Sequence, residues 1–571
     1  MQILRVNMSD LRAEREEIPE PYQEWAGRGL VAKVLEREVP PTCHPLGRAN
    51  KLILANGFFA GMHLSSAGRL SAGGKSPLTG GAKESNAGGT AGDAMARIGL
   101  RAIIVEGQPQ PGSLYLLNVG KDKADFIPAQ EYRAMGTFAL SRKLHDRFGI
   151  KAPIICIGPA GEMKLAAAGI AVSDADGHPN RYAGRGGMGA LMGAKGLKAI
   201  VIEDTRASVP LHDPVAFKTA HKAYNKAILE TPATAKSFPE LGTMNMYHNT
   251  YRLGAVPTRN FHTGRLEGFG DEAPEMLRET ILARGGEGTP THSCMHGCMV
   301  RCSNIFPDES GKTIVSPVEY ENVILLGTNL GIRSFDQIAR LNYLCNDLGL
   351  DTIEIGVAIG VAMEAGIIPF DDYEGAERLL REVGEGTPLG RILGQGATTV
   401  GRVYGVERVP AVKGQGIPAY DPRAIKGMGV TYITSPQGAD HTAGHTVKYK
   451  IDHHLKEGQI ETSRETQVDS AAWDALNLCN FLKAALESRP ETLIALYNAA
   501  YGTDHTPSFV KHLGRETLRA ELRFNHAAGF SRADDRHAEF FLTEKLPPYD
   551  VLFDISDEEI DTFWSFLDEQ A

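Results

Sequence analysis

"GRGGMGALMGAKGLKAIVIED", residues 184–204, decides what kind of N-terminal domain this chain forms. Its first six residues satisfy the pattern G-x-G-x-x-G, and Glu203 follows at a distance suited to a dinucleotide site. Such a site needs the glycines directly after a strand. Here residues 175–183 separate them from the preceding strand-like run, AGIAVSD (168–174). The sequence therefore favours a β-rich domain with glycine-rich connections over a Rossmann domain.

Short aliphatic runs bounded by turn residues occur throughout the first third of the chain and predict strands. They are KLILA (51–55), RAIIVEG (101–107), SLYLLNV (113–119), APIICIG (152–158), AGIAVSD (168–174) and KAIVIED (198–204). Residues 205–214 have the composition of a linker. We expect an N-terminal β-rich domain over residues 1–208.

Helical periodicity begins near residue 215. One predicted stripe consists of Ile338, Leu341, Leu344, Cys345 and Leu348. The run AAWDALNLCNFLKAALE (471–487) predicts a second helix, with Trp473, Leu476, Cys479 and Leu482 on one face. A Gly/Pro-rich break at 409–423 divides the helical part, which gives domains 209–411 and 412–571 and an α+β fold class. The acidic segment DISDEEIDTFWSFLDEQ (554–570) predicts a solvated C-terminal helix.

The composition excludes several classes of protein. Among 571 residues the net charge is −10, which disfavours a nucleic-acid groove. The longest weakly polar run, 355–363, is shorter than the roughly 20 residues that span a bilayer. The N-terminus lacks the apolar stretch of a signal peptide, and seven cysteines are too few for a disulfide framework. We expect a cytoplasmic protein.

A second glycine-rich stretch, GRLSAGGKSP (68–77), contains Gly-Lys-Ser but fails as a P-loop, because Arg69 stands where the first glycine must be. This loop and residues 184–189 can still hold anions. Consecutive glycines let backbone N–H groups approach a phosphate, and Arg69 and Arg185 add charge-assisted hydrogen bonds.

Three of the seven cysteines, Cys294, Cys298 and Cys302, fall within the nine residues CMHGCMVRC. Buried cysteines are usually inert, but this clustering favours a zinc site or an iron–sulfur cluster. A continuous helix would spread the outer two by about 12 Å, so we expect a loop or a helix end. His292 and His296 keep zinc open, and a radical SAM site would need a different spacing. We favour an iron–sulfur cluster with a distant fourth ligand.

The candidates for that fourth ligand are Cys43, Cys156, Cys345 and Cys479. Cys479 ends DALNLC (474–479), which is similar in form to NDLGLD (346–351). A carboxylate in such a segment can accept hydrogen bonds from a flat heterocycle with amino groups. The simpler interpretation is two helix C-termini capped by Gly349 and Asn477.

With these motifs in place, the chain resembles the aldehyde:ferredoxin oxidoreductase family of tungsten enzymes over more than four-fifths of its length. The resemblance is carried by AGRGLVAKVL, GRLSAGGKSPLTGGAKESNAGG, RYAGRGGMGALMGAKGLKAIVIE, the cysteine trio, SPVEYENVILLGTNLGI, NDLGLD, PAYDPR, TSPQGADHT and DALNLC. It implies tungsten or molybdenum held by two pterins, a [4Fe–4S] cluster and Mg²⁺. The β-rich domain would form the base for the pterins, and two helical domains would enclose the metal.

The resemblance also implies a role for individual residues. Cys479 would complete the cluster with Cys294, Cys298 and Cys302, and the backbone carbonyls of Asn86 and Ala183 would ligate Mg²⁺. The further cofactor-binding residues implied are Arg69, Ala87, Gly88, Gly184, Arg185, Gly186, Asn346, Gly349, Leu350, Asp351, Asp474 and Leu478.

Glu321 in EYE and His441 in GADHT match the family's acid/base residues. A carboxylate can take a proton from attacking water, and a histidine can donate one to a carbonyl oxygen. The implied reaction is oxidation of an aldehyde to a carboxylic acid, with electrons leaving through the cluster to ferredoxin or a small iron–sulfur subunit.

Three departures from the family pattern are visible: three residues between Cys294 and Cys298 where two are usual, Asn346 in place of Asp, and Asn477 in place of Gly. In addition, Arg340 and Tyr343 occupy the positions of a Glu-x-x-His motif, so we expect no iron bridging two subunits in a homo- or hetero-oligomer.

Two alternatives stay open: a reductive member such as the catalytic subunit of a tungsten-type benzoyl-CoA reductase, and a non-catalytic iron–sulfur electron-transfer protein.

Overall fold

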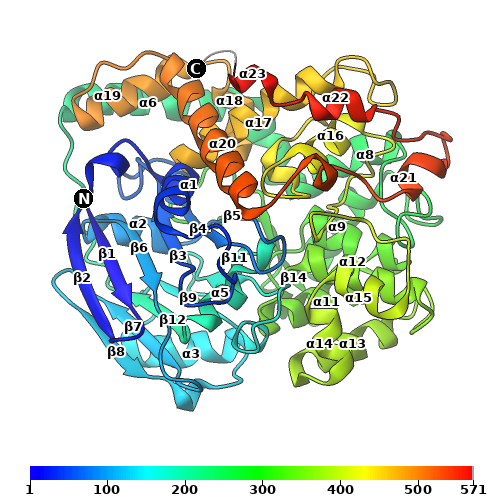
Figure 1. The fold of residues 1–571 in the computed structure, drawn as a ribbon, viewed down its shortest axis with the longest axis horizontal. Helices are drawn as coiled ribbons and strands as arrows, with labels where there is room; N and C mark the ends of the chain where they lie inside the picture. Colours follow the sequence, from blue (N-terminus) through cyan, green and yellow to red (C-terminus); the bar gives the residue numbers. More distant parts are fainter. Residues whose placement is uncertain (569–571) are drawn as a thin grey trace.

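Two six-stranded sheets form the first third of the molecule, in a computed structural model that describes residues 1–568 (Figure 1). The first sheet has the order β2-β1-β6-β3-β4-β5, and the second has the order β11-β10-β9-β12-β7-β8. The pairs β1/β6 and β7/β12 are parallel, and the other pairs in these sheets are antiparallel. The strands are β1 (Gln2–Asn7), β2 (Arg12–Glu17), β3 (Leu52–Asn56), β4 (Leu70–Lys75), β5 (Ala82–Ala87), β6 (Leu100–Glu106), β7 (Tyr115–Val119), β8 (Ala124–Pro128), β9 (Ile154–Cys156), β10 (Ile170–Val172), β11 (Arg181–Ala183) and β12 (Leu197–Ile202).

The central strands are continuous apolar runs because both of their faces are buried. In β3, Leu52 and Leu54 face the core shared by the two sheets. Ile53 and Ala55 point the other way, as the two-residue period of a strand requires, into a core formed with helices. The second sheet is covered on its outer face by α3, where Leu140 and Leu144 are fully buried.

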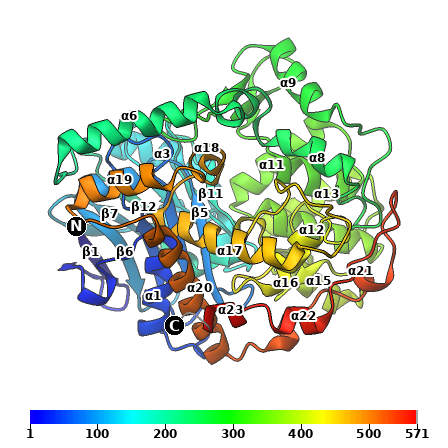
Figure 2. The same ribbon diagram turned by 90° about the horizontal axis from the view of Figure 1, so that it is seen from above.

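Five helices belong to this first part of the chain, and α1 packs on the first sheet together with helices from the C-terminal third (Figure 2). They are α1 (Gly27–Glu38), α2 (Ala91–Arg97), α3 (Thr137–Phe148), α4 (Pro159–Glu162) and α5 (Met188–Ala194). In the C-terminal third, α17 (Gln459–Leu476) runs toward the end of this sheet. Its close approach requires glycine at position 57, since a Cβ there would lie 2.4 Å from the Leu476 carbonyl oxygen.

The remainder of the chain is mostly helical, and one large hydrophobic core consists mainly of its residues. Its middle part contains α6 (Pro214–Glu230), α7 (Phe238–Leu241), α8 (Tyr247–Arg252), α9 (Ala273–Arg284), α10 (Tyr320–Leu325), α11 (Phe335–Leu348), α12 (Thr352–Glu364), α13 (Tyr373–Glu385), α14 (Pro388–Gly394) and α15 (Ala397–Tyr404), with the strands β13 (Thr289–His292), β14 (Ser303–Pro307), β15 (Thr313–Val315), β16 (Ala411–Val412) and β17 (Gln415–Gly416). The last part contains α16 (Lys426–Thr434), α17 (Gln459–Leu476), α18 (Lys483–Leu486), α19 (Pro490–Tyr501), α20 (Ser508–Ala528), α21 (Phe540–Thr543), α22 (Asp557–Asp561) and α23 (Ser565–Asp568).

The predicted α+β fold class is confirmed, and a strand overlaps each of the six predicted runs. Two helix predictions are wrong. The stretch 471–487 is not one helix, because α17 ends at Leu476 and Asn477 adopts the left-handed conformation, with φ of 58°. The tail is not a solvated helix either: it forms the short helices α22 and α23, and the Phe563 side chain between them is fully buried.

Residues 569–571 lie outside the described part of the chain. The domain boundaries near 208 and 411 stay predictions. Among residues 1–568, no helix is long and apolar enough to cross a bilayer.

A buried ion-pair network joins α1 to α17 and α20. The Arg28 guanidinium donates to both carboxylate oxygens of Glu521 at 2.8 Å and to Asp474 at 3.3 Å. We expect Arg28→Met to destabilise the protein by about 3–5 kcal/mol, because it leaves two buried carboxylates without their cation. Chemical denaturation measures this loss. A double variant with Glu521→Leu should recover part of it, and no recovery would show that the pairing is not the cause.

Candidate metallocofactor site

A cavity of about 320 Å³ lies where the ends of β5 and β11 meet the helical part of the chain. The four predicted thiols, the predicted acid/base pair and most of the predicted cofactor residues line this one cavity. The predicted residues in its wall are Arg69, Asn86, Gly88, Gly184, Arg185, Cys294, Cys298, Cys302, Glu321, Asn346, Leu350, Asp351, His441, Asp474, Leu478 and Cys479.

Four predicted residues are not part of this wall. Ala87 and Ala183 pack in the core between the two sheets. Gly349 caps α11 in the left-handed conformation, and Gly186, with φ of 75°, lies against the Lys83 side chain. Both predicted caps, Gly349 and Asn477, are therefore present, and the segments that contain them also line the cavity.

The cysteine trio lies on a loop between β13 and β14, as predicted, and not on a continuous helix. Cys298 is buried, while Cys294 and Cys302 are half-buried. Of the four cysteines considered as a distant ligand, only Cys479 lines the cavity within the described residues. Cys156 and Cys345 belong to other hydrophobic cores, and Cys43 packs at the edge of a third.

A serine that the sequence analysis did not identify connects the two parts of this thiol set. The Ser66 carbonyl accepts from the Cys479 backbone N–H at 3.0 Å, and its hydroxyl donates to the Cys298 sulfur at 3.2 Å. The neighbouring Ser65 hydroxyl accepts from Met299 N–H at 2.9 Å. The loop before β4 therefore fixes both the trio and its distant partner.

The thiols differ in acidity before any metal binds. The hydrogen bond from Cys294 lowers the pKa of Cys298 to about 5, against the effect of burial, and the Ser66 hydroxyl lowers it further. Burial raises the pKa values of Cys302 and Cys479. The hydrogen bond to Cys298 also raises the pKa of Cys294. Because metals bind thiolates, loading of this site must release protons from Cys294, Cys302 and Cys479.

The two histidines that kept zinc open do not join this thiol set. The His292 ring lies 2.7 Å from an Asp176 carboxylate oxygen through Nε2, and its Nδ1 lies 3.3 Å from the Arg181 guanidinium. Both ring nitrogens are thus engaged elsewhere. His296 is exposed and is not part of the cavity wall.

Arg69 lies against the thiols and is tied to the helix α17 cap. Burial acts to lower the pKa of its guanidinium, but the Cys479 and Cys294 sulfurs raise the pKa overall. Its Nε donates to the Asn86 side chain, which in turn donates to the Asn477 side chain. The Asn477 amide closes the ring by donating to the Arg69 carbonyl at 3.1 Å. Asn477, the departure from the family's glycine, is therefore a structural partner of two predicted cofactor residues.

We expect Asn477→Gly to separate these hydrogen bonds from the backbone conformation. Glycine accepts the left-handed φ freely, so the loss comes from the hydrogen bonds alone and should be about 1–2 kcal/mol of stability. Asn477→Ala should cost about 1 kcal/mol more, because alanine resists that φ. Thermal unfolding of the two variants measures both terms. Equal stability of the glycine variant and the natural protein would contradict the role of the side chain.

Gly88 allows the end of β5 to approach the cysteine loop, since a Cβ at this position would lie 3.2 Å from the Cys294 sulfur and 3.7 Å from the Arg69 guanidinium. At the opposite wall, Arg185 is held by the protein itself. It donates to Asp351 at 3.3 Å and to the Gly416 carbonyl at 2.6 Å. Its guanidinium is thus already largely engaged.

The two predicted pterin segments place a buried carboxylate each in the cavity wall. Asp351 caps α12 by accepting from Ile353 N–H at 3.0 Å, and Asp474 accepts from Arg28. Burial raises the pKa of Asp474. Asn346 is buried, and its carbonyl accepts from the Thr137 hydroxyl at 2.9 Å, which holds the first segment against α3.

Glu321 and His441 face each other across the same cavity. Glu321 lies in the first turn of α10, and its Oε1 is 3.6 Å from His441 Nδ1, too long for a hydrogen bond. Both atoms are buried and have no hydrogen-bond partner among residues 1–568. Burial raises the pKa of Glu321 to about 8 and lowers that of His441 to about 4. At neutral pH the pair is therefore a carboxylic acid and a neutral imidazole, and each has one atom that is free to form a hydrogen bond.

A second contact missed from the sequence fixes the backbone at His441. The buried Lys83 ammonium on β5 lies 2.5 Å from the Asp440 carboxylate. That carboxylate also accepts from Thr442 N–H at 3.0 Å. Lys83 and Arg185 hold the pKa of Asp440 well below its usual range despite burial. Asp440 is thus a fixed anion that joins the first sheet to the turn bearing His441.

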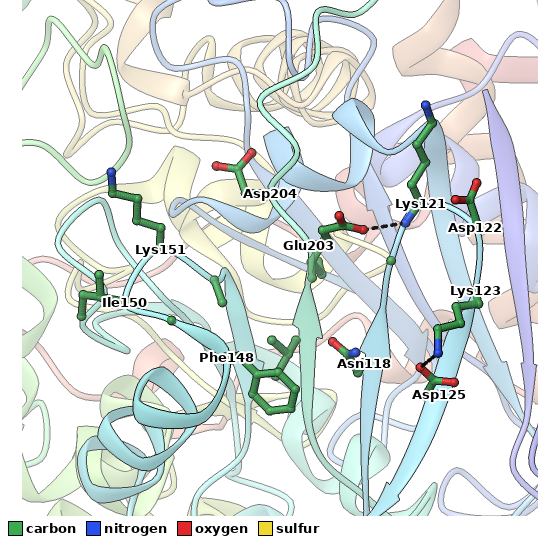
Figure 3. Close-up of a pocket in the computed structure, with 15 residues that line it drawn as sticks. Asn118, Lys121, Asp122, Lys123, Asp125, Phe148, Ile150, Lys151, Glu203 and Asp204 are labelled. Carbon is green, nitrogen blue, oxygen red and sulfur yellow. Dashed lines mark hydrogen bonds and ion pairs between the residues drawn. The ribbon is translucent and has the colours of Figure 1, made fainter.

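A surface depression of about 810 Å³ lies elsewhere, beside β7, β8 and β12 (Figure 3). Its charged side chains have mixed signs and lie spread along its rim. Glu203 accepts from Lys121 N–H, and Lys123 pairs with Asp125. It contains no convergent acid/base pair, so the smaller buried cavity is the candidate site.

Four thiols that line one cavity with a carboxyl–imidazole pair, each member of which has an unpartnered buried atom, are typical of redox metalloenzymes. Comparison with known proteins gives the family. "Aldehyde ferredoxin oxidoreductase, N-terminal domain" matches residues 3–204, and "Aldehyde ferredoxin oxidoreductase, domains 2 & 3" matches residues 219–563. The chain belongs to the aldehyde ferredoxin oxidoreductase family, as its motifs predict.

Individual relatives agree with this assignment. The chain is 32% identical to the tungsten-containing aldehyde ferredoxin oxidoreductase of Pyrococcus furiosus and 31% identical to that of Thermococcus kodakarensis, each over 95% of this chain and 91% of that protein. It is 25% identical to the aliphatic sulfonate oxidoreductase, WOR-like subunit, of P. furiosus, over 85% of this chain and 78% of that protein. The fold is shared with the active site complex BamBC of benzoyl coenzyme A reductase in complex with 1,5-dienoyl-CoA, with a TM-score of 0.84 at 18% identity, covering 99% of this chain and 94% of that chain.

Membership of this family implies a tungsten–pterin cofactor and an iron–sulfur cluster, and the cavity fits both. Four thiols converge with a cation, Arg69, beside them, which suits a cluster of net negative charge. The unpartnered atoms of Glu321 and His441 face the same space. The glycines at 88 and 184 leave the wall open to a large ligand.

Proposed function

We propose that the protein is a tungsten or molybdenum bis-pterin oxidoreductase that oxidises aldehydes to carboxylic acids. One observation carries the proposal: the four thiols and the Glu321–His441 pair line a single buried cavity. An electron-accepting centre and an acid/base pair are what the reaction requires in one place.

In this proposal Cys294, Cys298, Cys302 and Cys479 would hold a [4Fe–4S] cluster, and Arg69, beside the thiols, would contact a pterin phosphate. Asp351 and Asp474 would each bind the ring nitrogens of one pterin. The backbone carbonyls of Asn86 and Ala183 would ligate the Mg²⁺ that joins the pterin phosphates. The remaining residues proposed to contact the cofactor are Ala87, Gly88, Gly184, Arg185, Gly186, Asn346, Gly349, Leu350 and Leu478.

The reaction converts an aldehyde and water into a carboxylate, three protons and two electrons. When bound, the metallopterin supplies the two-electron acceptor and the site of oxygen transfer. The protonated Glu321 carboxyl donates a hydrogen bond to the aldehyde oxygen, and the neutral His441 imidazole accepts a proton from water. This assignment reverses the roles expected from the sequence, because burial shifts the two pKa values in opposite directions.

A cluster held by Cys294, Cys298, Cys302 and Cys479 would pass electrons one at a time to ferredoxin or a small iron–sulfur subunit. These four of the seven cysteines line one cavity. Arg340 is exposed, and the Tyr343 ring stacks on Phe138 with centroids 5.0 Å apart. Neither side chain supplies the carboxylate or the imidazole of the Glu-x-x-His motif, so the oligomer we propose has no bridging iron.

A reductive role is the second candidate, favoured by the three-residue gap between Cys294 and Cys298. An anaerobic screen of aldehydes and aryl-CoA esters in both redox directions tests the choice. Oxidation of aldehydes with reduction of ferredoxin is the expected result, and turnover of aryl-CoA esters alone would overturn it.

Metal analysis should give about four irons and one tungsten or molybdenum per chain. Iron without either heavy metal would leave only an electron-transfer protein.

A further inference from the structure

A second cavity, of about 540 Å³, shares Glu321 and His441 with the cofactor cavity and extends to the surface. At its outer end Ala484, Glu487 and Ser488 are exposed. Because it joins the acid/base pair to solvent, it is the route by which a substrate reaches the pair.

Aromatic rings form much of the inner wall of this channel. The Phe238 and Phe481 ring centroids are 4.4 Å apart, and those of Tyr320 and Tyr420 are 5.2 Å apart. The body of the substrate therefore passes between apolar ring faces and edges, which suits a hydrocarbon or aryl framework.

Two lysines line the same channel, and only one of them has a carboxylate partner. Lys448 lies 2.5 Å from Glu487. The Lys483 ammonium donates to the Ser470 hydroxyl at 2.8 Å, and no carboxylate of residues 1–568 lies within 4 Å of it. Asp474, Glu487 and Asp469 act on it only at longer range. Lys483 is thus a partly buried cation without a counter-ion.

The lysines lie beyond His445 as seen from the catalytic pair. The His445 ring is 6.4 Å from His441 and meets Tyr420 edge-on at 4.9 Å. Desolvation lowers the pKa of this half-buried imidazole to about 3, and charges at Lys483 and Lys448 lower it further. The order along the channel is therefore acid/base pair, neutral imidazole and aromatic rings, and then the unpaired ammonium.

We propose that Lys483, with Ser470, is the specificity-determining site for a carboxylate at the end of the substrate remote from its aldehyde group. The ammonium and the hydroxyl together offer donors for one singly charged acidic group, while the rings hold the carbon framework and Glu321 and His441 meet the aldehyde. A single unpaired cation does not balance the two charges of a phosphate monoester, which favours a carboxylate. This inference rests on the proposed aldehyde oxidation.

Binding of unreactive ketones tests the site without turnover. We expect the cofactor-loaded protein to bind 4-acetylbenzoate about ten- to a hundredfold more tightly than 4-acetylbenzamide by calorimetry, as one charge-assisted hydrogen bond provides. Lys483→Met should remove this preference without weakening amide binding, and Lys483→Arg should retain it. Lys143→Met, on the exposed surface of α3, is the matched control and should change neither affinity.

The same preference should hold in kcat/KM for 4-formylbenzoate against 4-formylbenzamide. If Lys483→Met fails to fold, Ser470→Ala should still reduce the carboxylate preference several-fold. Equal binding of the acid and the amide by the natural protein, or a preference that survives both substitutions, overturns the inference. If neither aldehyde is oxidised, the proposed function fails, while calorimetry still decides whether Lys483 binds a carboxylate.

Discussion

Cys479→Ala should remove the iron–sulfur cluster, and Cys43→Ala should leave it intact. Iron should fall from about four atoms per chain to less than one in the first variant, and the broad visible absorption of the cluster should disappear with it. The reason is geometric: Cys479 lines the cavity with the cysteine trio, whereas Cys43 packs at the edge of a hydrophobic core and does not.

A matched control for this experiment is Ser66→Ala, which keeps all four thiols. It removes one hydrogen bond to the Cys298 sulfur and leaves the backbone contact to Cys479 in place. We expect the cluster to form in this variant, because the thiolates are the ligands. Four irons in Cys479→Ala, or loss of the cluster in Cys43→Ala, would show that the fourth ligand is a different residue.

The strands in the six aliphatic runs and the helix α11 could be predicted from the sequence because their burial follows a simple period. In β6, Ile103 and Val105 face one core and Ala102 and Ile104 the other, so the run of four aliphatic or small residues at 102–105 is a strand buried on both faces. In α11, Ile338, Leu341 and Cys345 are all fully buried on one stripe.

The end of α17 could not be found in this way. Apolar residues continue past Leu476 at helical spacing, yet Asn477 turns the chain so that its side chain reaches Asn86 and Arg69. Tertiary hydrogen bonds outweigh periodicity at this point, and the result is that Cys479 lies beside the trio and not on a helix face.

The supporting residues of the site were missed for a related reason. Ser66 and Cys298 are 232 residues apart in sequence, and Lys83 and Asp440 are 357 apart. No local pattern encodes such contacts. The one available signal for the Lys83–Asp440 contact was a lysine within the strand AKESNA (82–87). A buried cation in a sheet requires an anion beside it.

The largest catalytic effect should come from Glu321 and His441. Replacing either by alanine should lower kcat by about 10²–10⁴, the usual contribution of a positioned acid or base. Glu321→Gln distinguishes the two roles open to the carboxyl. An amide can still donate a hydrogen bond to the aldehyde oxygen but cannot accept a proton from water. We therefore expect Glu321→Gln to retain substantially more activity than Glu321→Ala.

The pH profile of kcat/KM follows from the same pair, with the signs fixed by the two pKa shifts. Activity should rise as His441 loses its proton near pH 4 and should fall as Glu321 loses its own near pH 8, because the active form contains a neutral imidazole and a protonated carboxyl. In Glu321→Gln the alkaline fall should disappear, since the amide does not titrate. If activity instead rises through pH 8 in the natural protein and Glu321→Gln is as inactive as Glu321→Ala, the carboxylate is the base. That result would mean that bound metallopterin shifts the pKa values of Glu321 and His441 away from those that burial alone produces.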